Sequence, residues 1–198
     1  MNTRIFMACM ALLLALPSLA QEAKWKPIFN GQDLNGWKAV AGKATFAVKD
    51  GILEGTAVYG TGNTFLITED SYGDFILELE LKISHSSSNS GIMARGQYDA
   101  SKNEGKGLVY GYQVEADPTP RAWSGGIYDE ARRGCFYPLD LNPAAKSAFK
   151  LGEWNHYRIE AIGNTLKTWV NGQEVAYFVD EVDARGFIGL QVHSIQSK

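Results

Sequence analysis

The sequence predicts an all-β protein, a sandwich or barrel of antiparallel strands with one short helix. Short apolar stretches recur along the chain, and 21 glycines punctuate them. Residues 75–83 alternate between apolar and polar side chains, as expected for a strand with one face on a core. No linker, low-complexity tract or repeat divides the chain. Many short strands joined by tight turns in one domain are typical of antiparallel sandwiches and barrels.

Two hairpins are predicted from their turns. Residues 46–58 carry Asp50-Gly51 between two apolar runs, and residues 164–178 carry Asn171-Gly172 in the same setting. Such pairs are favoured in two-residue hairpin turns, because both positions need a positive φ.

Four further stretches are strand candidates, and one stretch is a helix candidate. The strand candidates are residues 89–98, 110–118, 155–163 and 186–194. A short helix is expected in residues 141–149, where Asn142 can cap the helix and Pro143 suits its first position.

The N-terminus begins with a positive charge and an apolar run. Arg4 precedes residues 5–20, which end in Ser18-Leu19-Ala20. This pattern is typical of a secretory signal peptide. We therefore expect a signal peptide at residues 1–20, a single domain at residues 21–198, and a periplasmic or secreted protein. An uncleaved anchor is the alternative, although the run is short for a membrane-spanning helix.

The composition narrows the classes of molecule that the protein is expected to bind. The formal net charge is −3 and no basic stretch could follow a phosphate backbone, so nucleic acid and anionic membranes are disfavoured. The 12% of aromatic residues suits stacking on sugar rings. Without the signal peptide, Cys135 is the single cysteine, so no internal disulfide is expected. Its neighbours Phe136 and Tyr137 predict a buried apolar role for it.

Period-two alternation places a polar row on residues 110–118. Gln113, Glu115 and Asp117 share one face, opposite Tyr112 and its apolar neighbours. Acidic groups in such a row repel one another unless cations lie opposite. Glu115 is therefore a candidate site residue, and an ordinary solvated sheet face is the alternative.

Alternation makes similar predictions for two other strands. Arg95 is expected to share a face with Asn89 and Met93, and is a candidate cation for the acidic row. In residues 188–193, Gln191 and His193 lie opposite the apolar side chains.

A loop is expected at residues 121–134, where charged and aromatic side chains surround two adjacent glycines. The Gly125-Gly126 pair permits close approach of the backbone to a ligand. Aromatic rings in this loop can stack on a ligand, and the guanidinium groups of its arginines can donate two hydrogen bonds at once. An exposed, salt-bridged loop is the alternative. The residues expected to contact substrate are Gln113, Asp117, Arg121, Trp123, Tyr128, Glu130 and Arg132.

No cofactor is predicted. The three histidines have no paired spacing, and HExxH and CxxC motifs are missing from the sequence. A divalent metal held by residues from distant strands stays an open alternative.

An ordered set of short motifs resembles the 3-keto-disaccharide hydrolase domain family. It includes IFNGQDLNGWK, YGDFILELELKI, SNSGIMARG, GYQVEADP, GGIYDE, EWNHYRIEAIGN and GFIGLQVH, and covers roughly residues 26–193. The resemblance implies a concanavalin-like jelly-roll sandwich, export, and action on oxidised glycosides. Similar family members continue past LQVH into one more strand. The chain is therefore expected to be truncated or to lack its last strand, leaving an open sheet edge.

The implied substrate carries a ketone at sugar carbon 3, and the implied reaction is elimination followed by hydration. Such a reaction needs a base, an acid and a group that holds the enolate oxygen. Under this reading Glu115 is the base or acid, Glu80 or His193 is its counterpart, and Arg95 binds the enolate or a hydroxyl. Trp123 and Tyr128 form the sugar platform. The alternatives are a non-catalytic carbohydrate-binding module and an ordinary glycoside hydrolase that uses two carboxylates, such as Glu80 and Glu115.

Overall fold

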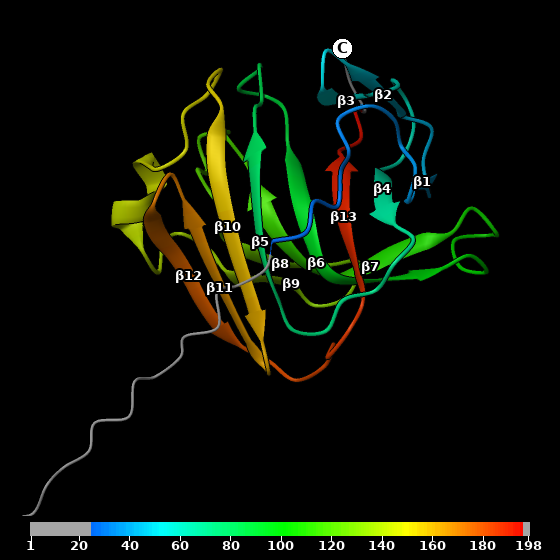
Figure 1. The fold of residues 1–198 in the computed structure, drawn as a ribbon. Coiled ribbons are helices and arrows are strands. Elements are labelled where there is room, and N and C mark those ends of the chain that lie inside the picture. Colours follow the sequence, from blue (N-terminus) through cyan, green and yellow to red (C-terminus); the bar gives the residue numbers. More distant parts are fainter. Residues whose placement is uncertain (1–24, 196–198) are drawn as a thin grey trace, which may run out of the picture.

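The strands form two facing sheets with a small hairpin beside them (Figure 1). This computed structural model describes residues 25–195. Every pairing between its named strands is antiparallel, which confirms the predicted all-β sandwich. Within the described residues, no helix has the length and apolar character needed to cross a lipid bilayer.

The larger sheet contains, in spatial order, β1 (Trp37–Val40), β4 (Thr64–Thr68), β13 (Phe187–Val192), β6 (Ser90–Asp99), β7 (Leu108–Ala116), β8 (Ile127–Glu130) and β9 (Gly134–Tyr137). The smaller sheet contains β12 (Gln173–Val179), β11 (Thr165–Val170), β10 (Asn155–Ile162) and β5 (Phe75–Leu81). A separate hairpin contains β2 (Thr45–Lys49) and β3 (Ile52–Thr56).

Both predicted hairpin turns are present. Asp50 and Gly51 have φ values of 52° and 79°, and Asn171 and Gly172 have φ values of 50° and 80°. Positive φ at both central residues is what a two-residue hairpin turn of this kind requires. The β2–β3 and β11–β12 registers are therefore set locally by the sequence.

The main core lies between the sheets and follows the alternation of each strand. On β7, Tyr112, Val114 and Ala116 point into it, and on β5 Leu77 does so. The odd-numbered residues of β7 consequently face away from the core.

That outward face of the larger sheet is itself partly apolar. Its residues Phe65, Ile67, Met93, Val109 and Phe187 form a second buried cluster. Polar residues of β7 and β13 follow this cluster along the same face, because they alternate with core residues. The larger sheet therefore has a covered surface on both sides.

A bulge in β6 changes the predicted direction of Arg95. The β6–β7 register shifts between Met93 and Gln97, and Arg95 has a φ of 57°. The expected sharing of a face by Arg95, Asn89 and Met93 is wrong, since the extra residue breaks the alternation. The guanidinium donates to the carbonyls of residues 73, 161, 163 and 183 and to Asp74 Oδ1, at 2.7–3.3 Å.

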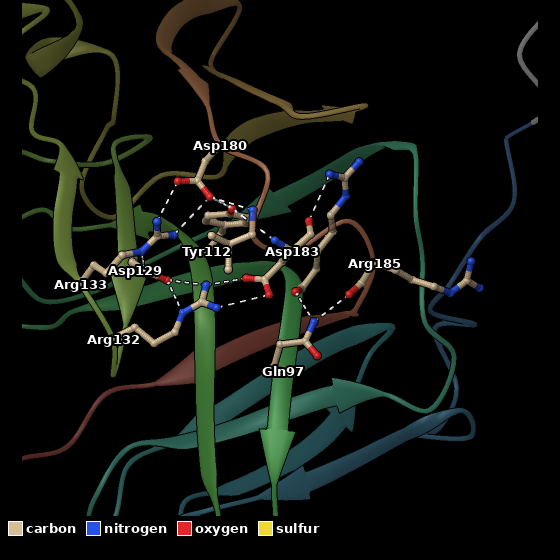
Figure 2. A network of polar contacts seen from close by, with 10 residues as sticks. Gln97, Tyr112, Asp129, Arg132, Arg133, Asp180, Asp183 and Arg185 are labelled. Atoms are coloured by element: carbon tan, nitrogen blue, oxygen red, sulfur yellow. Dashed lines mark hydrogen bonds and ion pairs between the residues drawn. The ribbon is translucent and has the colours of Figure 1, made fainter.

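A network of ion pairs joins the β8–β9 turn to the β12–β13 connection (Figure 2). Asp129, which is fully buried, accepts from Arg132 Nη2 at 2.7 Å and from Arg133 Nε at 2.5 Å. Arg132 continues to Asp183, and Arg133 Nη1 continues to Asp180 at 2.8 Å. The connection that crosses between the two sheets is thereby fixed to the larger sheet.

Two local predictions need correction. The expected helix is a single 3-10 turn, η1 (Pro143–Ser147), and Asn142 does not cap it. Its amide instead donates to the carbonyls of Glu174 and Val175, because a tertiary partner on β12 is in reach. The expected loop at residues 121–134 contains β8, whose four residues are too short to show a sequence period.

Two predictions about the chain ends are not resolved by the fold. The signal peptide expected at residues 1–20 lies outside the described residues. Leu190, Gln191 and Val192 of the LQVH segment lie in β13, which is paired with β4 on one side and with β6 on the other. The expected truncation or missing last strand stays a prediction.

The Asp129 network predicts a large loss of stability on Asp129→Asn. The change leaves two arginines with one fewer buried counter-charge, and breaking a buried ion pair costs about 3–5 kcal/mol. Urea unfolding measures the loss. Lys106→Gln, which removes the exposed Lys106–Glu104 pair, is the control and changes stability by less than about 1 kcal/mol. Equal effects of the two changes would contradict the prediction.

The Arg95 contacts predict that lysine cannot replace it. A single ammonium cannot reach four carbonyls and a carboxylate at once, so Arg95→Lys loses on the order of 3 kcal/mol. Arg158→Lys is the matched control, because Arg158 pairs with Glu78 and Glu160 on the outer face of the smaller sheet. Chemical denaturation of both variants should separate them clearly; an Arg95→Lys protein as stable as the control contradicts this account.

Candidate functional site

The site is a group of polar side chains on the outward face of the larger sheet. Gln113 and Glu115 come from β7, and Gln191 comes from β13. Gly91 on β6 pairs with Glu115, and the hydroxyl of Ser90 donates to the carbonyl of Gln191 at 2.7 Å. The strand between β7 and β13 therefore places a glycine between the three polar side chains.

Glu115 is nearly excluded from water, with 4% of its surface exposed. Its Oε1 accepts from Gln113 Nε2 at 3.2 Å, and its Oε2 accepts from Asn89 Nδ2 at 3.4 Å. Burial raises the pKa of Glu115 to about 7, although the two amides and the charge of Arg121 lower it. At neutral pH this carboxyl group can both accept and release a proton.

The two glutamines have unused hydrogen-bonding atoms. Gln113 Oε1, Gln191 Oε1 and Gln191 Nε2 are buried and have no hydrogen-bond partner among residues 25–195. Buried polar atoms are nearly always paired, so three unpaired atoms on one sheet face mark a place for water or for polar groups of another molecule.

Tyr128 extends the site onto β8. It pairs with Gln113 across the sheet and with Cys135 on its other side. Burial raises the pKa of Tyr128, and the neighbouring Glu130 and Glu115 raise it further. Tyr128 is therefore a protonated donor at neutral pH. Cys135 is half-buried, whereas the sequence predicted a buried residue.

A second polar group involves Glu130 and His193. Asn63 Nδ2 donates to Glu130 Oε1 at 3.1 Å, and Asn63 Oδ1 accepts from the backbone of Ser194 at 2.9 Å. Burial raises the pKa of Glu130, while Asn63 and His193 lower it. His193 Nδ1 lies 3.0 Å from the carbonyl of Ser194. Asn63 thus links Glu130 of β8 to Ser194, which follows β13.

The segment after β7 folds back onto that strand. Asp117 Oδ2 accepts from Arg121 Nε at 2.6 Å, and the Arg121 guanidinium lies 4.3 Å from the ring centre of Trp123. The backbone of Gly125 donates to the carbonyl of Glu115 at 2.7 Å. A Cβ at Gly125 would lie 2.9 Å from Val170 and Val175, so this glycine permits close contact with the smaller sheet. It does not carry the ligand-facing role expected for it.

The structure brings some of the predicted site residues together and separates others. Glu115, Gln113 and Tyr128 are neighbours, and Arg121 with Trp123 and the Glu130–His193 group lie next to them. Glu80 lies elsewhere: it is exposed on β5, opposite His156 in the smaller sheet. Arg95 and Arg132 lie in the structural contacts described above, and Asp117 holds the chain after β7.

Sequence reasoning gave no site role to four residues here. They are Asn63, Asn89 and Gln191 as polar neighbours, and Gly91 as the residue beneath Gln113. Alternation did place Gln191 on the polar face of its strand, but it did not show that this face is buried. The amides of Asn63 and Asn89 lie outside regular strands, and their role depends on contacts 67 and 26 residues away in sequence.

Residues 25–195 contain no group of three or more His, Cys, Asp or Glu side chains placed to hold an ion. The site offers a buried carboxyl group, neutral amides and a phenol.

Comparison with solved structures identifies the fold. The chain is similar to the carbohydrate-binding module CBM66 of Bacillus subtilis, with 20% identity, 80% of this chain and 88% of that chain covered, and a TM-score of 0.54. It is similar to a protein of Parabacteroides distasonis ATCC 8503 provisionally named as a glycosyl hydrolase, with 19% identity, coverage of 85% and 87%, and a TM-score of 0.60. It is also similar to the β-glucanase of Bacillus licheniformis, with 12% identity, coverage of 83% and 82%, and a TM-score of 0.52.

At these identities the likeness shows a shared fold, and it confirms the predicted jelly-roll sandwich. No curated protein matches the sequence. The family comparison is more specific and confirms the resemblance seen in the motifs. Residues 24–198 match the family described as the 3-keto-alpha-glucoside-1,2-lyase-like domain, and the chain belongs to that family.

Proposed function

We propose that the protein acts on carbohydrates and cleaves 3-keto glycosides by elimination followed by hydration. The observation that carries this proposal is Glu115, a buried carboxyl group with a pKa of about 7 beside unpaired amide atoms. Family membership supports the substrate class. Catalytic acids and bases are found where burial shifts a pKa toward the working pH.

In the proposed reaction, the ketone at carbon 3 acidifies the hydrogen on carbon 2. The Glu115 carboxylate takes that proton, and the electron pair forms the double bond between carbons 1 and 2. The glycosidic oxygen leaves carbon 1 with its bonding pair and takes up a proton. Water then adds to carbon 1, and a proton returns to carbon 2. The net change is hydrolysis to a 3-keto sugar and an alcohol.

Glu115 is suited to both proton transfers. A base with a pKa near the working pH is ionised often enough to react, and its conjugate acid can return the proton. Asn89 and Gln113 hold the two carboxyl oxygens, so the group has a fixed orientation. Tyr128, protonated beside it, and His193, beside Glu130, are the proposed donors to the developing enolate and to the leaving oxygen.

Glu80 does not suit the predicted role of counterpart to Glu115. Glu115 lies on the outward face of the larger sheet, whereas Glu80 is exposed on β5 of the smaller sheet. Facing sheets pack about 10 Å apart, so the core separates these carboxylates. An ordinary two-carboxylate mechanism with this pair would need the groups within roughly 5–9.5 Å across one bond.

A carbohydrate-binding module is the second candidate function. Similarity to a carbohydrate-binding module and the neutral amides of Gln113 and Gln191 favour it. A binding module has no need for a buried carboxyl group that titrates near pH 7. The role of Glu115 therefore separates the two candidates.

Glu115→Gln tests the proposed catalysis. The amide keeps the shape of the side chain but cannot accept a proton, so kcat/KM on a 3-keto glucoside falls by about 10²–10⁴-fold. Sugar release is the measurement, with binding of the sugar retained. Glu80→Gln is the matched control and keeps full activity. Full activity of Glu115→Gln, or a comparable loss in Glu80→Gln, rules out the assignment.

Glu115 also predicts a pH dependence of stability. Its folded pKa of about 7 lies above the ordinary value of 4.5, so the folded protein holds this proton more tightly than the unfolded chain. This contribution to stability is present below about pH 4.5 and is lost as pH rises through about 7. As the pH rises from about 4.5 to about 7, the free energy of unfolding of the wild type should fall by on the order of 3 kcal/mol relative to that of Glu115→Gln. Unfolding curves at pH 5 and pH 8 measure it, and identical pH dependence in both proteins would contradict it.

A further inference from the structure

Gln191 stands out among the buried polar residues because neither of its amide atoms is paired. Its side chain is 3% exposed, and both Oε1 and Nε2 lack a hydrogen-bond partner in the part of the chain that the structure describes. Gln113, which is 2% exposed, leaves its Oε1 unpaired on the same sheet face. Burying an unpaired amide opposes folding, so a purely structural role would favour an apolar residue here.

The Gln113 side chain lies directly over Gly91. A Cβ at Gly91 would lie 2.5 Å from both Cγ and Cδ of Gln113, so a side chain at this position would displace Gln113. The glycine is therefore required for the present position of the Gln113 amide.

The unpaired atoms define the chemistry of a ligand. Gln113 Nε2 is held by Glu115, so the free atom of Gln113 is an acceptor. Gln191 offers one acceptor and an amide donor. A matching ligand presents hydroxyl groups to the two acceptors and an oxygen lone pair to the donor. The nearest cation, Arg121, is paired with Asp117, and Glu115 is acidic, so a neutral ligand is favoured.

We propose that Gln191 and Gln113 form the subsite that binds the glycone ring, a neutral ring with hydroxyl groups and a carbonyl or hydroxyl oxygen as acceptor. Gln191 donates to that acceptor oxygen, and both amides accept from hydroxyl groups. The reacting carbons then lie on the side of Glu115. The assignment of the ring as the reacting sugar rests on the proposed function, whereas the binding of a neutral sugar does not.

Gln191→Met tests the subsite. Methionine keeps an unbranched side chain of similar length but removes both amide atoms. We expect a melting temperature equal to or above that of wild type, and a Kd for methyl 3-keto-α-glucoside raised about 10–100-fold through two lost hydrogen bonds. A lower melting temperature with unchanged Kd indicates a structural amide and overturns the proposal.

A pair of glycine variants provides an independent test. Gly91→Ala pushes the Gln113 amide away and should weaken sugar binding. Gly189→Ala adds the same methyl group to the same sheet face, where it meets Phe187, Ile67 and Met93 at 3.1–3.3 Å, and serves as the control. Equal Kd values for these two variants would overturn the proposal.

A binding measurement separates failure of this subsite from failure of the proposed enzyme. If wild type does not cleave the 3-keto glycoside, the proposed function fails. The subsite is still supported if NMR titration shows wild type binding methyl α-D-glucoside and Gln191→Met losing that binding. If wild type binds neither sugar, the subsite proposal is overturned.

Discussion

The structure depends on one constraint: both faces of the larger sheet are shielded from water. Its inner face packs on the smaller sheet, while its outer face carries the cluster around Met93 and Phe187 and then the polar row. Glu115 and the glutamines are therefore buried in a low-dielectric environment even though they face away from the main core. The same carboxyl group on a solvated sheet face would keep an ordinary pKa and would be a weaker base.

Two charged assemblies help to keep this arrangement in place. Arg95 ties β6 to backbone carbonyls beside the smaller sheet, and Asp129 with its two arginines anchors the β12–β13 connection. Figure 2 shows how the ion pairs meet around Asp129 and Asp183. Several of their members are arginines and aspartates of the kind found in active sites. Here their donors and acceptors are used up within the protein, so their role is structural.

The candidate site has the opposite character. Glu115 is disfavoured as a charged group by its burial, and the two glutamines retain unpaired atoms. Each of these features lowers the stability of the folded chain, and such costs are common at functional sites. The structural polar residues form a network of paired donors and acceptors, whereas the candidate site keeps unpaired atoms. Composition alone does not distinguish these two kinds of polar residue.

The sequence by itself determined the class of fold, the two hairpin turns and the polar face that contains Gln113 and Glu115. Strand alternation and turns of the Asp-Gly or Asn-Gly type involve only a few consecutive residues, so they can be recognised in the sequence alone. Tertiary structure decided the rest. The bulge in β6 turns Arg95 away from Glu115. Glu80 belongs to the smaller sheet, so the core separates it from the site. Gln191 and Asn89 reach the site from distant parts of the chain. These outcomes depend on strand order and burial, which arise from packing between segments far apart in sequence.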